Sequence, residues 1–226
     1  KGDIDFAAKL AKLGDVYVND AFGTAHRAHA STSTVAQFFE AEEKSFGFLI
    51  ENEIKFAGKL LNSPRRPFVA ILGGAKVSDK IKLIEKLIDK ANYILIGGGM
   101  SYTFTKALGG KIGDSLVEDE QLDLALELLA KAKEQNVEIV LPTDTIVADK
   151  FAPDADTQIC KSDSVPDGWM GLDIGPETIQ KFSDVILSAQ SILWNGPVGV
   201  FEFEAFDKGT FAIAKTVAES TSKGAF

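Results

Sequence analysis

A glycine-rich segment with two lysines is the part of this sequence best suited to hold a charged ligand. Residues 73–80 read Gly-Gly-Ala-Lys-Val-Ser-Asp-Lys and directly follow the apolar run 68–72. Glycines let the chain turn and let a ligand come close to the backbone. A helix beginning after them would offer unpaired N–H groups to an anion, and Lys76 and Lys80 would share one face of it. The segment therefore predicts a site for phosphate groups, such as those of a nucleotide.

A plain turn followed by solvated lysines is the alternative interpretation of the same segment. Glycine pairs follow strands in many α/β proteins, and lysines at helical spacing usually face water. The segment matches neither the G-x-x-x-x-G-K-[ST] loop nor the G-x-G-x-x-G fingerprint. Taken alone, it leaves both readings open.

The elements that would position this segment alternate along the chain. Apolar runs predict strands at 15–19, 68–72, 93–96, 137–141, 145–148 and 191–194, and longer amphipathic stretches predict helices at 3–13, 47–63, 76–90, 100–108, 118–135, 176–189 and 205–221. Strands that alternate with helices form a mostly parallel sheet covered on both faces. We therefore expect a Rossmann-like, three-layer α/β fold.

Two further glycine-rich loops follow predicted strands. Residues 97–99 are Gly-Gly-Gly, and residues 195–199 read Asn-Gly-Pro-Val-Gly. In open parallel sheets, ligands bind beyond the carboxyl ends of the strands. Three such loops at one edge of a sheet favour a nucleotide site over three unrelated turns.

Composition limits the partners of the chain. It has 226 residues, a formal net charge of −9 and a sequence pI of about 4.8, so nucleic acid and anionic membranes are not expected partners. A single cysteine, Cys160, allows no disulfide within the chain. No apolar run approaches the ~20 residues of a membrane span. The chain begins with Lys and stops at Phe226, and we expect both ends to be cuts in a longer protein.

Five motifs, in order along the chain, resemble those of phosphoglycerate kinase. They occupy residues 14–29, 73–80, 97–100, 168–176 and 194–202, and the resemblance extends nearly from end to end. It implies a truncated two-domain kinase that transfers a phosphoryl group from 1,3-bisphosphoglycerate to ADP, giving 3-phosphoglycerate and ATP, with Mg²⁺. By the same resemblance, the protein is expected to be a cytoplasmic monomer that binds these small molecules and neither nucleic acid nor membrane.

The resemblance also implies a division into domains. Residues 1–46 would be the remnant of the N-terminal, substrate-binding lobe. Residues 47–63 would be the interdomain helix. Residues 64–226 would be an incomplete C-terminal, nucleotide-binding lobe.

Roles for individual residues follow from the resemblance. Lys76 would be catalytic and would stabilise the transferring phosphoryl group, Lys80 and Asn195 would hold nucleotide phosphates, and Glu202 would bind the ribose. Arg27 would contact the non-transferred end of the glycerate substrate. The residues expected to line the base are Gly73, Gly97, Gly98, Gly171, Leu172 and Pro197.

Two parts of the family pattern have no counterpart in this sequence. These are the basic patch of the N-terminal lobe and a Gly-Gly-Gly-Asp-Thr loop whose aspartate binds the metal, so no metal ligand is expected within residues 1–226. We therefore expect this stretch alone to be inactive as a kinase. A non-catalytic nucleotide-binding module and a fragment that binds nothing are the alternatives.

Overall fold

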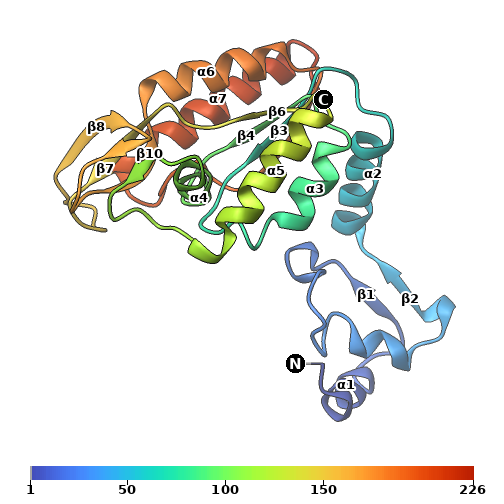
Figure 1. Ribbon diagram of the computed structural model, residues 1–226. Coiled ribbons are helices and arrows are strands. Elements are labelled where there is room, and N and C mark those ends of the chain that lie inside the picture. Colours follow the sequence, from blue (N-terminus) through green and yellow to red (C-terminus); the bar gives the residue numbers. More distant parts are fainter. Residues whose placement is uncertain (1) are drawn as a thin grey trace. The chain divides into compact units, whose positions relative to one another are not determined.

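The computed structural model describes residues 2–226, and these residues form two compact units (Figure 1). The first unit extends to Ser63 and the second runs from Pro64 to Phe226.

The first unit is built on short elements around a small core. Helix α1 (Ile4–Ala11) begins after Asp3, whose carboxylate accepts a hydrogen bond from Phe6 N at 2.7 Å. Strands β1 (Tyr17–Asn19) and β2 (Lys44–Phe46) pair in parallel, and β1 is shorter than the predicted strand 15–19. The 3-10 helices are η1 (Phe22–Thr24), η2 (Thr34–Phe38) and η3 (Ala41–Glu43).

Helix α2 (Phe48–Asn62) ends the first unit and corresponds to the predicted helix 47–63. Asp20 fixes its start, because its Oδ1 accepts a hydrogen bond from Ile50 N at 2.9 Å. A Cβ atom at Gly47 would lie 2.4 Å from Cγ of Asp20, so the glycine makes room for this cap. An N-terminal cap of this kind satisfies one of the free N–H groups of a helix.

A four-stranded parallel sheet is the centre of the second unit. Its order is β11-β3-β4-β6, with strands β3 (Phe68–Leu72), β4 (Tyr93–Ile96), β6 (Glu138–Val140) and β11 (Ser191–Asn195). All five residues of β3 are buried, as expected for a central parallel strand.

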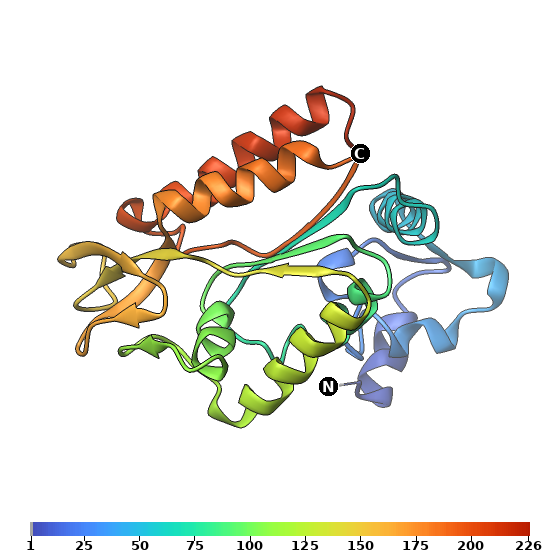
Figure 2. The same ribbon diagram turned by 45° about the horizontal axis from the view of Figure 1, so that its top comes forward.

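Helices cover both faces of this sheet, which confirms the predicted three-layer fold (Figure 2). The helices α6 (Pro176–Ser188) and α7 (Lys208–Ser222) lie on one face, and α3 (Ile81–Ile88) and α5 (Leu122–Glu134) lie on the other. Val69, Ile71 and Leu95 pack in one buried cluster with Phe182 of α6 and Ile213 of α7.

The second unit also contains an antiparallel sheet of three strands, whose order in the sheet is β10-β7-β8. Its strands are β7 (Asp144–Ala148), β8 (Thr157–Lys161) and β10 (Met170–Ile174). The predicted strand 145–148 therefore exists, and it pairs with its neighbours in this antiparallel sheet. The remaining elements are the pair β5 (Lys111–Ile112) and β9 (Ser164–Val165), helix α4 (Met100–Ala107), and the 3-10 helices η4 (Asp119–Gln121) and η5 (Glu204–Phe206).

The helix predicted over 76–90 begins later than expected. Residues 78–80 form a turn, and α3 begins only at Ile81, with Lys80 as its N-cap residue. Lys76 and Lys80 therefore do not share a helical face. Asp79 and Ser78 favour turns over helix interiors because their side chains compete for backbone hydrogen bonds, which accounts for the later start.

Candidate functional site

The three glycine-rich loops leave neighbouring strands at one edge of the parallel sheet. Asn195 of β11 is paired with Leu72 of β3, and Leu72 with Ile96 of β4, so the three strands end at the same level. The loops touch through their backbones: Gly73 N donates to Asn195 O at 3.1 Å, and Gly98 N donates to Val198 O at 2.9 Å. The convergence expected from the sequence is confirmed.

Glycine is needed where these loops meet. A Cβ atom at Gly73 would lie 1.9 Å from the carbonyl oxygen of Pro197, and one at Gly97 would lie 2.7 Å from Cβ of Val198. Gly98 has a φ angle of 69°, in the left-handed region that favours glycine. Gly73 and Gly97 thus serve the packing of the loops.

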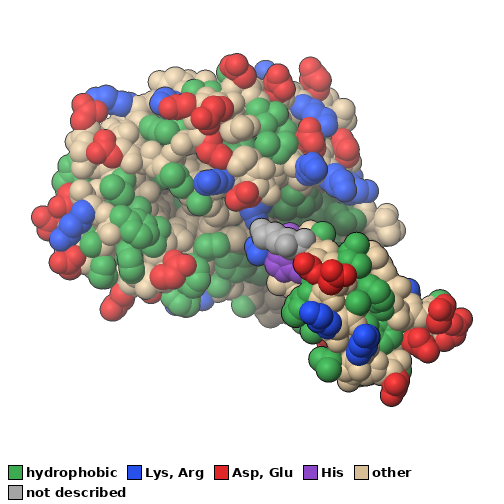
Figure 3. Space-filling view, turned by 90° about the horizontal axis from the view of Figure 1, so that it is seen from below, with side chains coloured by type: hydrophobic (Ala, Val, Ile, Leu, Met, Phe, Trp, Pro, Cys, Tyr) green, Lys and Arg blue, Asp and Glu red, His purple; other side chains and the backbone are tan. Residues whose placement is uncertain are grey.

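A cavity of about 700 Å³ opens beside the loops. In Figure 3, hydrophobic side chains gather around a hollow on the face of the larger unit, with acidic and basic side chains interspersed around it. Of the eleven predicted site residues, those on the cavity wall are Gly98, Gly171, Leu172, Pro197 and Glu202. Ser101, Tyr102, Thr145, Asp173 and Val200 are wall residues to which the sequence analysis gave no role.

The two predicted phosphate-binding lysines lie outside the cavity wall. Lys76 is exposed in the loop after β3, and Lys80 is half-buried at the start of α3. The ammonium group of Lys80 donates a hydrogen bond to Oδ1 of Asn195, which brings together two of the three residues expected at the phosphates. This contact joins the loop after β3 to the loop after β11.

Glu118 anchors the lysine-bearing loop, a role that nothing in the sequence indicated. Its carboxylate accepts hydrogen bonds from Ser78 N at 3.0 Å and from Ser78 Oγ at 2.5 Å. Its own backbone N donates to Oγ1 of Thr103 on α4 at 3.2 Å. Partial burial opposes ionisation, but the hydrogen bonds from Ser78 and Val77, with the charge of Lys76, lower the pKa of Glu118.

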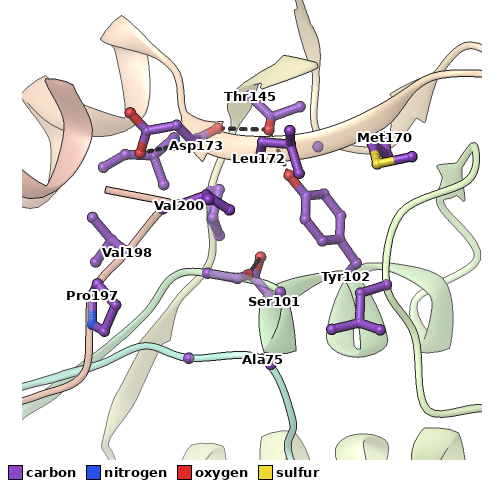
Figure 4. A pocket seen from close by; sticks show the side chains of 18 of the residues that line it. Ala75, Ser101, Tyr102, Thr145, Met170, Leu172, Asp173, Pro197, Val198 and Val200 are labelled. Carbon is purple, nitrogen blue, oxygen red and sulfur yellow. Dashed lines mark hydrogen bonds between the residues drawn. The ribbon is translucent and has the colours of Figure 1, made fainter. Parts of the chain in front are cut away.

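A chain of buried hydroxyl groups crosses one end of the cavity (Figure 4). Tyr102 projects from α4 toward the antiparallel sheet, and its hydroxyl oxygen lies 2.6 Å from Oγ1 of Thr145 on β7. Oγ1 of Thr145 donates to the backbone carbonyl of Asp173 on β10 at 2.8 Å. Burial raises the pKa of Tyr102, partly offset by the hydrogen bond with Thr145, so the phenol stays neutral.

Asp173 is a buried carboxyl group held by backbone donors. Gly209 N at the start of α7 donates to one oxygen at 2.7 Å, and Ile174 N donates to the other at 2.9 Å. Cβ atoms at Gly199 and Gly209 would lie 2.1 Å and 2.2 Å from Oδ1, so both glycines leave room for the carboxyl group. Burial, with a contribution from the nearby charge of Asp207, raises the pKa of Asp173 to about 7, although the two backbone hydrogen bonds favour the charged form.

Arg27, the predicted substrate residue, belongs to the first unit and is not a wall residue of the cavity. Its Nε donates to Nε2 of His26 at 3.2 Å, and its carbonyl accepts from Oγ1 of Thr32 at 3.2 Å. The placement agrees with a loop held by local hydrogen bonds. Its role toward a substrate stays a prediction.

Within residues 2–226, no three His, Cys, Asp or Glu side chains lie close enough together to hold a metal ion. These residues thus offer no preformed cluster of three metal-ligating side chains. Over the same residues, no helix is long and apolar enough to cross a membrane.

Comparison with known proteins agrees with this architecture. The family model of phosphoglycerate kinase matches residues 1–226. The chain belongs to the phosphoglycerate kinase family. It is 53% identical over 222 residues to a phosphoglycerate kinase of Porphyromonas gingivalis, which covers 98% of this chain and 53% of that protein. It is also 53% identical over 224 residues to the cytosolic phosphoglycerate kinase 3 of Arabidopsis thaliana, covering 99% of this chain and 55% of that protein.

Solved phosphoglycerate kinases share the fold. The structure from Coxiella burnetii has a TM-score of 0.81 and 44% identity, covering 97% of this chain and 56% of that one. The structure from Pyrococcus horikoshii has a TM-score of 0.80 and 29% identity, covering 96% and 56%. The chain thus spans about half the length of the phosphoglycerate kinases that it matches. Relatives include proteins named cytosolic and proteins named chloroplastic.

Proposed function

We propose that the protein containing this chain is a phosphoglycerate kinase in activity, and that it transfers a phosphoryl group reversibly between 1,3-bisphosphoglycerate and ADP. The observation that carries the proposal is the convergence of three glycine-rich loops, from β3, β4 and β11, beside one cavity of about 700 Å³. Pockets of roughly 300–1,000 Å³ with mostly apolar walls and a few polar groups are typical small-molecule sites.

The cavity is the proposed place of the nucleoside. Gly98, Gly171, Leu172 and Pro197 offer a small, apolar wall against which a flat base can lie, and Glu202 at the wall offers a carboxylate to the two ribose hydroxyls. Glycine at 98 and 171 lets the base approach the backbone. Gly73 and Gly97 would act on the base indirectly, by keeping the loops packed.

The phosphates would extend from the cavity toward the loop after β3. Lys80 and Asn195, already hydrogen-bonded to each other, would bind them, and Lys76 would stabilise the charge that spreads over the transferring phosphoryl oxygens. Glu118 would hold this loop in place through Ser78. Mg²⁺ would enter with the phosphates of the nucleotide, its usual ligands in kinases.

The remaining roles extend the same proposal to the other unit. Residues 1–46 would belong to the substrate-binding lobe, with Arg27 binding the non-transferred end of the glycerate, 47–63 would form the interdomain helix, and 64–226 would belong to the nucleotide-binding lobe. Arginine suits that task because its guanidinium group binds carboxylate or phosphate in bidentate fashion. We further propose a monomeric, cytoplasmic enzyme.

A coupled assay of the intact protein tests the proposal. ATP formation from 1,3-bisphosphoglycerate and Mg·ADP is followed through hexokinase and glucose-6-phosphate dehydrogenase. Lys86→Ala, at an exposed position on α3, is the matched control for loss of a lysine near the site. Turnover that falls with Lys76→Ala and persists with Lys86→Ala supports the proposal, and an intact protein without turnover refutes it.

A non-catalytic nucleotide-binding protein is the second candidate, because the cavity and the three glycine-rich loops beside it would serve nucleotide binding without catalysis equally well. The two candidates differ in one result. Saturable binding of Mg·ADP by calorimetry, with no turnover in the coupled assay, would select the binding protein.

A further inference from the structure

Three hydroxyl side chains on the cavity wall, Ser101, Tyr102 and Thr145, already donate their hydrogens to other groups of the protein. Oγ of Ser101 donates to the carbonyl of Gly98 at 2.7 Å, and Oγ1 of Thr145 donates to the carbonyl of Asp173 at 2.8 Å. A carbonyl oxygen can only accept, so the direction of both hydrogen bonds is fixed. Ser101 and Thr145 are only 3% and 1% exposed, and neither has a hydrogen left for a ligand.

The commitment of Thr145 fixes the direction of the next hydrogen bond. Because Thr145 has given its single hydrogen to Asp173, it must accept from the hydroxyl of Tyr102, 2.6 Å away. The phenol is neutral, since burial raises its pKa, and it has one hydrogen. The Tyr102 hydroxyl therefore donates its hydrogen to Thr145, and its oxygen can still accept a hydrogen bond. Within residues 2–226 that oxygen has no other partner.

The Tyr102 oxygen is set in apolar surroundings. Met170 and Leu172 of β10 flank it on the cavity wall (Figure 4). Gly171, between them, lies so close that a Cβ atom there would be 1.7 Å from the hydroxyl. The hydroxyl thus reaches β10 only because residue 171 has no side chain. A site with a buried polar group that a ligand must pair discriminates strongly against ligands that leave that group unpaired.

We infer that the Tyr102 hydroxyl makes the cavity selective for a purine nucleotide with an amino group at C6 over one with a keto group there. The inference rests on the proposed function, because it deepens the assignment of the cavity to a nucleoside. A 6-amino group donates a hydrogen bond to the Tyr102 oxygen. A 6-keto oxygen would face it as a second acceptor, leaving both unpaired, which is costly in a buried site.

Calorimetric titration of the intact protein with Mg·ADP and Mg·IDP tests the inference, since IDP replaces the 6-amino group by a keto group and adds no 2-amino group. The wild type is expected to bind ADP more tightly. Tyr102→Phe removes the acceptor and leaves Thr145 bonded to Asp173, so this variant is expected to fold. It should lower the ADP-to-IDP affinity ratio about three- to tenfold, the effect of one neutral hydrogen bond.

Two changes at Thr145 separate selectivity from packing. Thr145→Val removes the acceptor for the Tyr102 hydrogen, which can then be donated to a 6-keto group, so the ratio should shift toward IDP. Thr145→Ser keeps the hydroxyl and should restore the wild-type ratio. Tyr93→Phe, on β4 and not among the wall residues of the cavity, is the control and should leave the ratio unchanged.

Each result has a definite meaning. A ratio that falls in Tyr102→Phe and shifts toward IDP in Thr145→Val supports the inference. Equal changes in ADP and IDP affinity in Tyr102→Phe, or a wild-type ratio in Thr145→Val, overturn it while leaving the proposed function standing. Failure of the wild type to bind either nucleotide overturns the proposed function, and the inference with it.

Discussion

The buried carboxyl group of Asp173 predicts a specific dependence of stability on pH. The perturbation is Asp173→Asn, which keeps the shape of the side chain and removes its titration. In the folded protein the pKa of Asp173 is raised by burial from 3.8 to about 7. At pH values between 3.8 and about 7, the carboxyl group of Asp173 is therefore protonated in the folded state and ionised in the unfolded state.

The sign and size of the effect follow from this difference. Where the folded state binds more protons, the free energy of unfolding falls as pH rises. The contribution of Asp173 is therefore fully present below its unfolded pKa of 3.8 and lost as pH rises through about 7. A difference of one pKa unit corresponds to about 1.4 kcal/mol, so we expect the free energy of unfolding to fall by about 2 to 3 kcal/mol between pH 5 and pH 8 because of Asp173.

Urea unfolding at several pH values measures this contribution. Trp169 and Trp194 both lie in the second unit, so their fluorescence reports on the unit that contains Asp173. The quantity to plot is the free energy of unfolding of the wild type minus that of Asp173→Asn, because other titrating groups cancel in the difference. Asp123→Asn, at an exposed position on α5, controls for the change of side chain itself.

The expected difference declines with pH and flattens above about pH 8. A difference that stays constant from pH 5 to pH 8 would show that the carboxyl group titrates alike in the folded and unfolded states. That result would refute the argument that the site formed by Gly199 and Gly209 takes the carboxyl group out of water.

Three further substitutions test the site. Lys76→Ala should lower kcat at least tenfold with little change in ADP affinity, and steady-state kinetics showing a rise in KM for ADP alone would contradict its role at the transferring group. Glu118→Ala removes two hydrogen bonds to Ser78, together about 1–2 kcal/mol, and should lower kcat severalfold. Adding Ser78→Ala to this variant should lower kcat little further, whereas additive losses would argue against the role of Glu118 in holding the loop through Ser78. Gly171→Ala places a Cβ atom 1.7 Å from the Tyr102 hydroxyl, so we expect a loss of about 1–3 kcal/mol of stability in urea unfolding and weaker ADP binding; wild-type values for both would contradict the packing described here.

The parallel sheet could be predicted from the sequence because its central strands, β3 and β4, are buried on both faces. Such strands read as continuous apolar runs, and Phe68–Leu72, Tyr93–Ile96 and Ser191–Asn195 lie where those runs do. The loops after them converge because parallel strands of neighbouring position end at one edge. This geometry follows from the order of elements alone.

The antiparallel sheet could not be predicted in the same way. Strand β8 (Thr157–Lys161) is exposed at four of its five positions, so it has no apolar periodicity. Its pairing with β7 depends on contacts that local sequence does not contain. The sequence therefore predicted the strand 145–148 but not the sheet to which it belongs.

The polar network of the cavity also could not be predicted from the sequence. Tyr102, Thr145 and Asp173 are far apart in the chain, and no motif or regular spacing links them. Only the meeting of α4, β7 and β10 shows that their hydroxyl and carbonyl groups bond in series. Glu118 was missed for a similar reason, since it reaches Ser78 across forty positions of sequence.

The crystal structure of the intact protein with Mg·ADP is the most direct test of the central claim. The account predicts the base against Gly98, Gly171 and Leu172 in the cavity, with the phosphates directed toward Lys76 and Lys80. A nucleotide bound elsewhere, with this cavity left empty at saturating ADP, would contradict it.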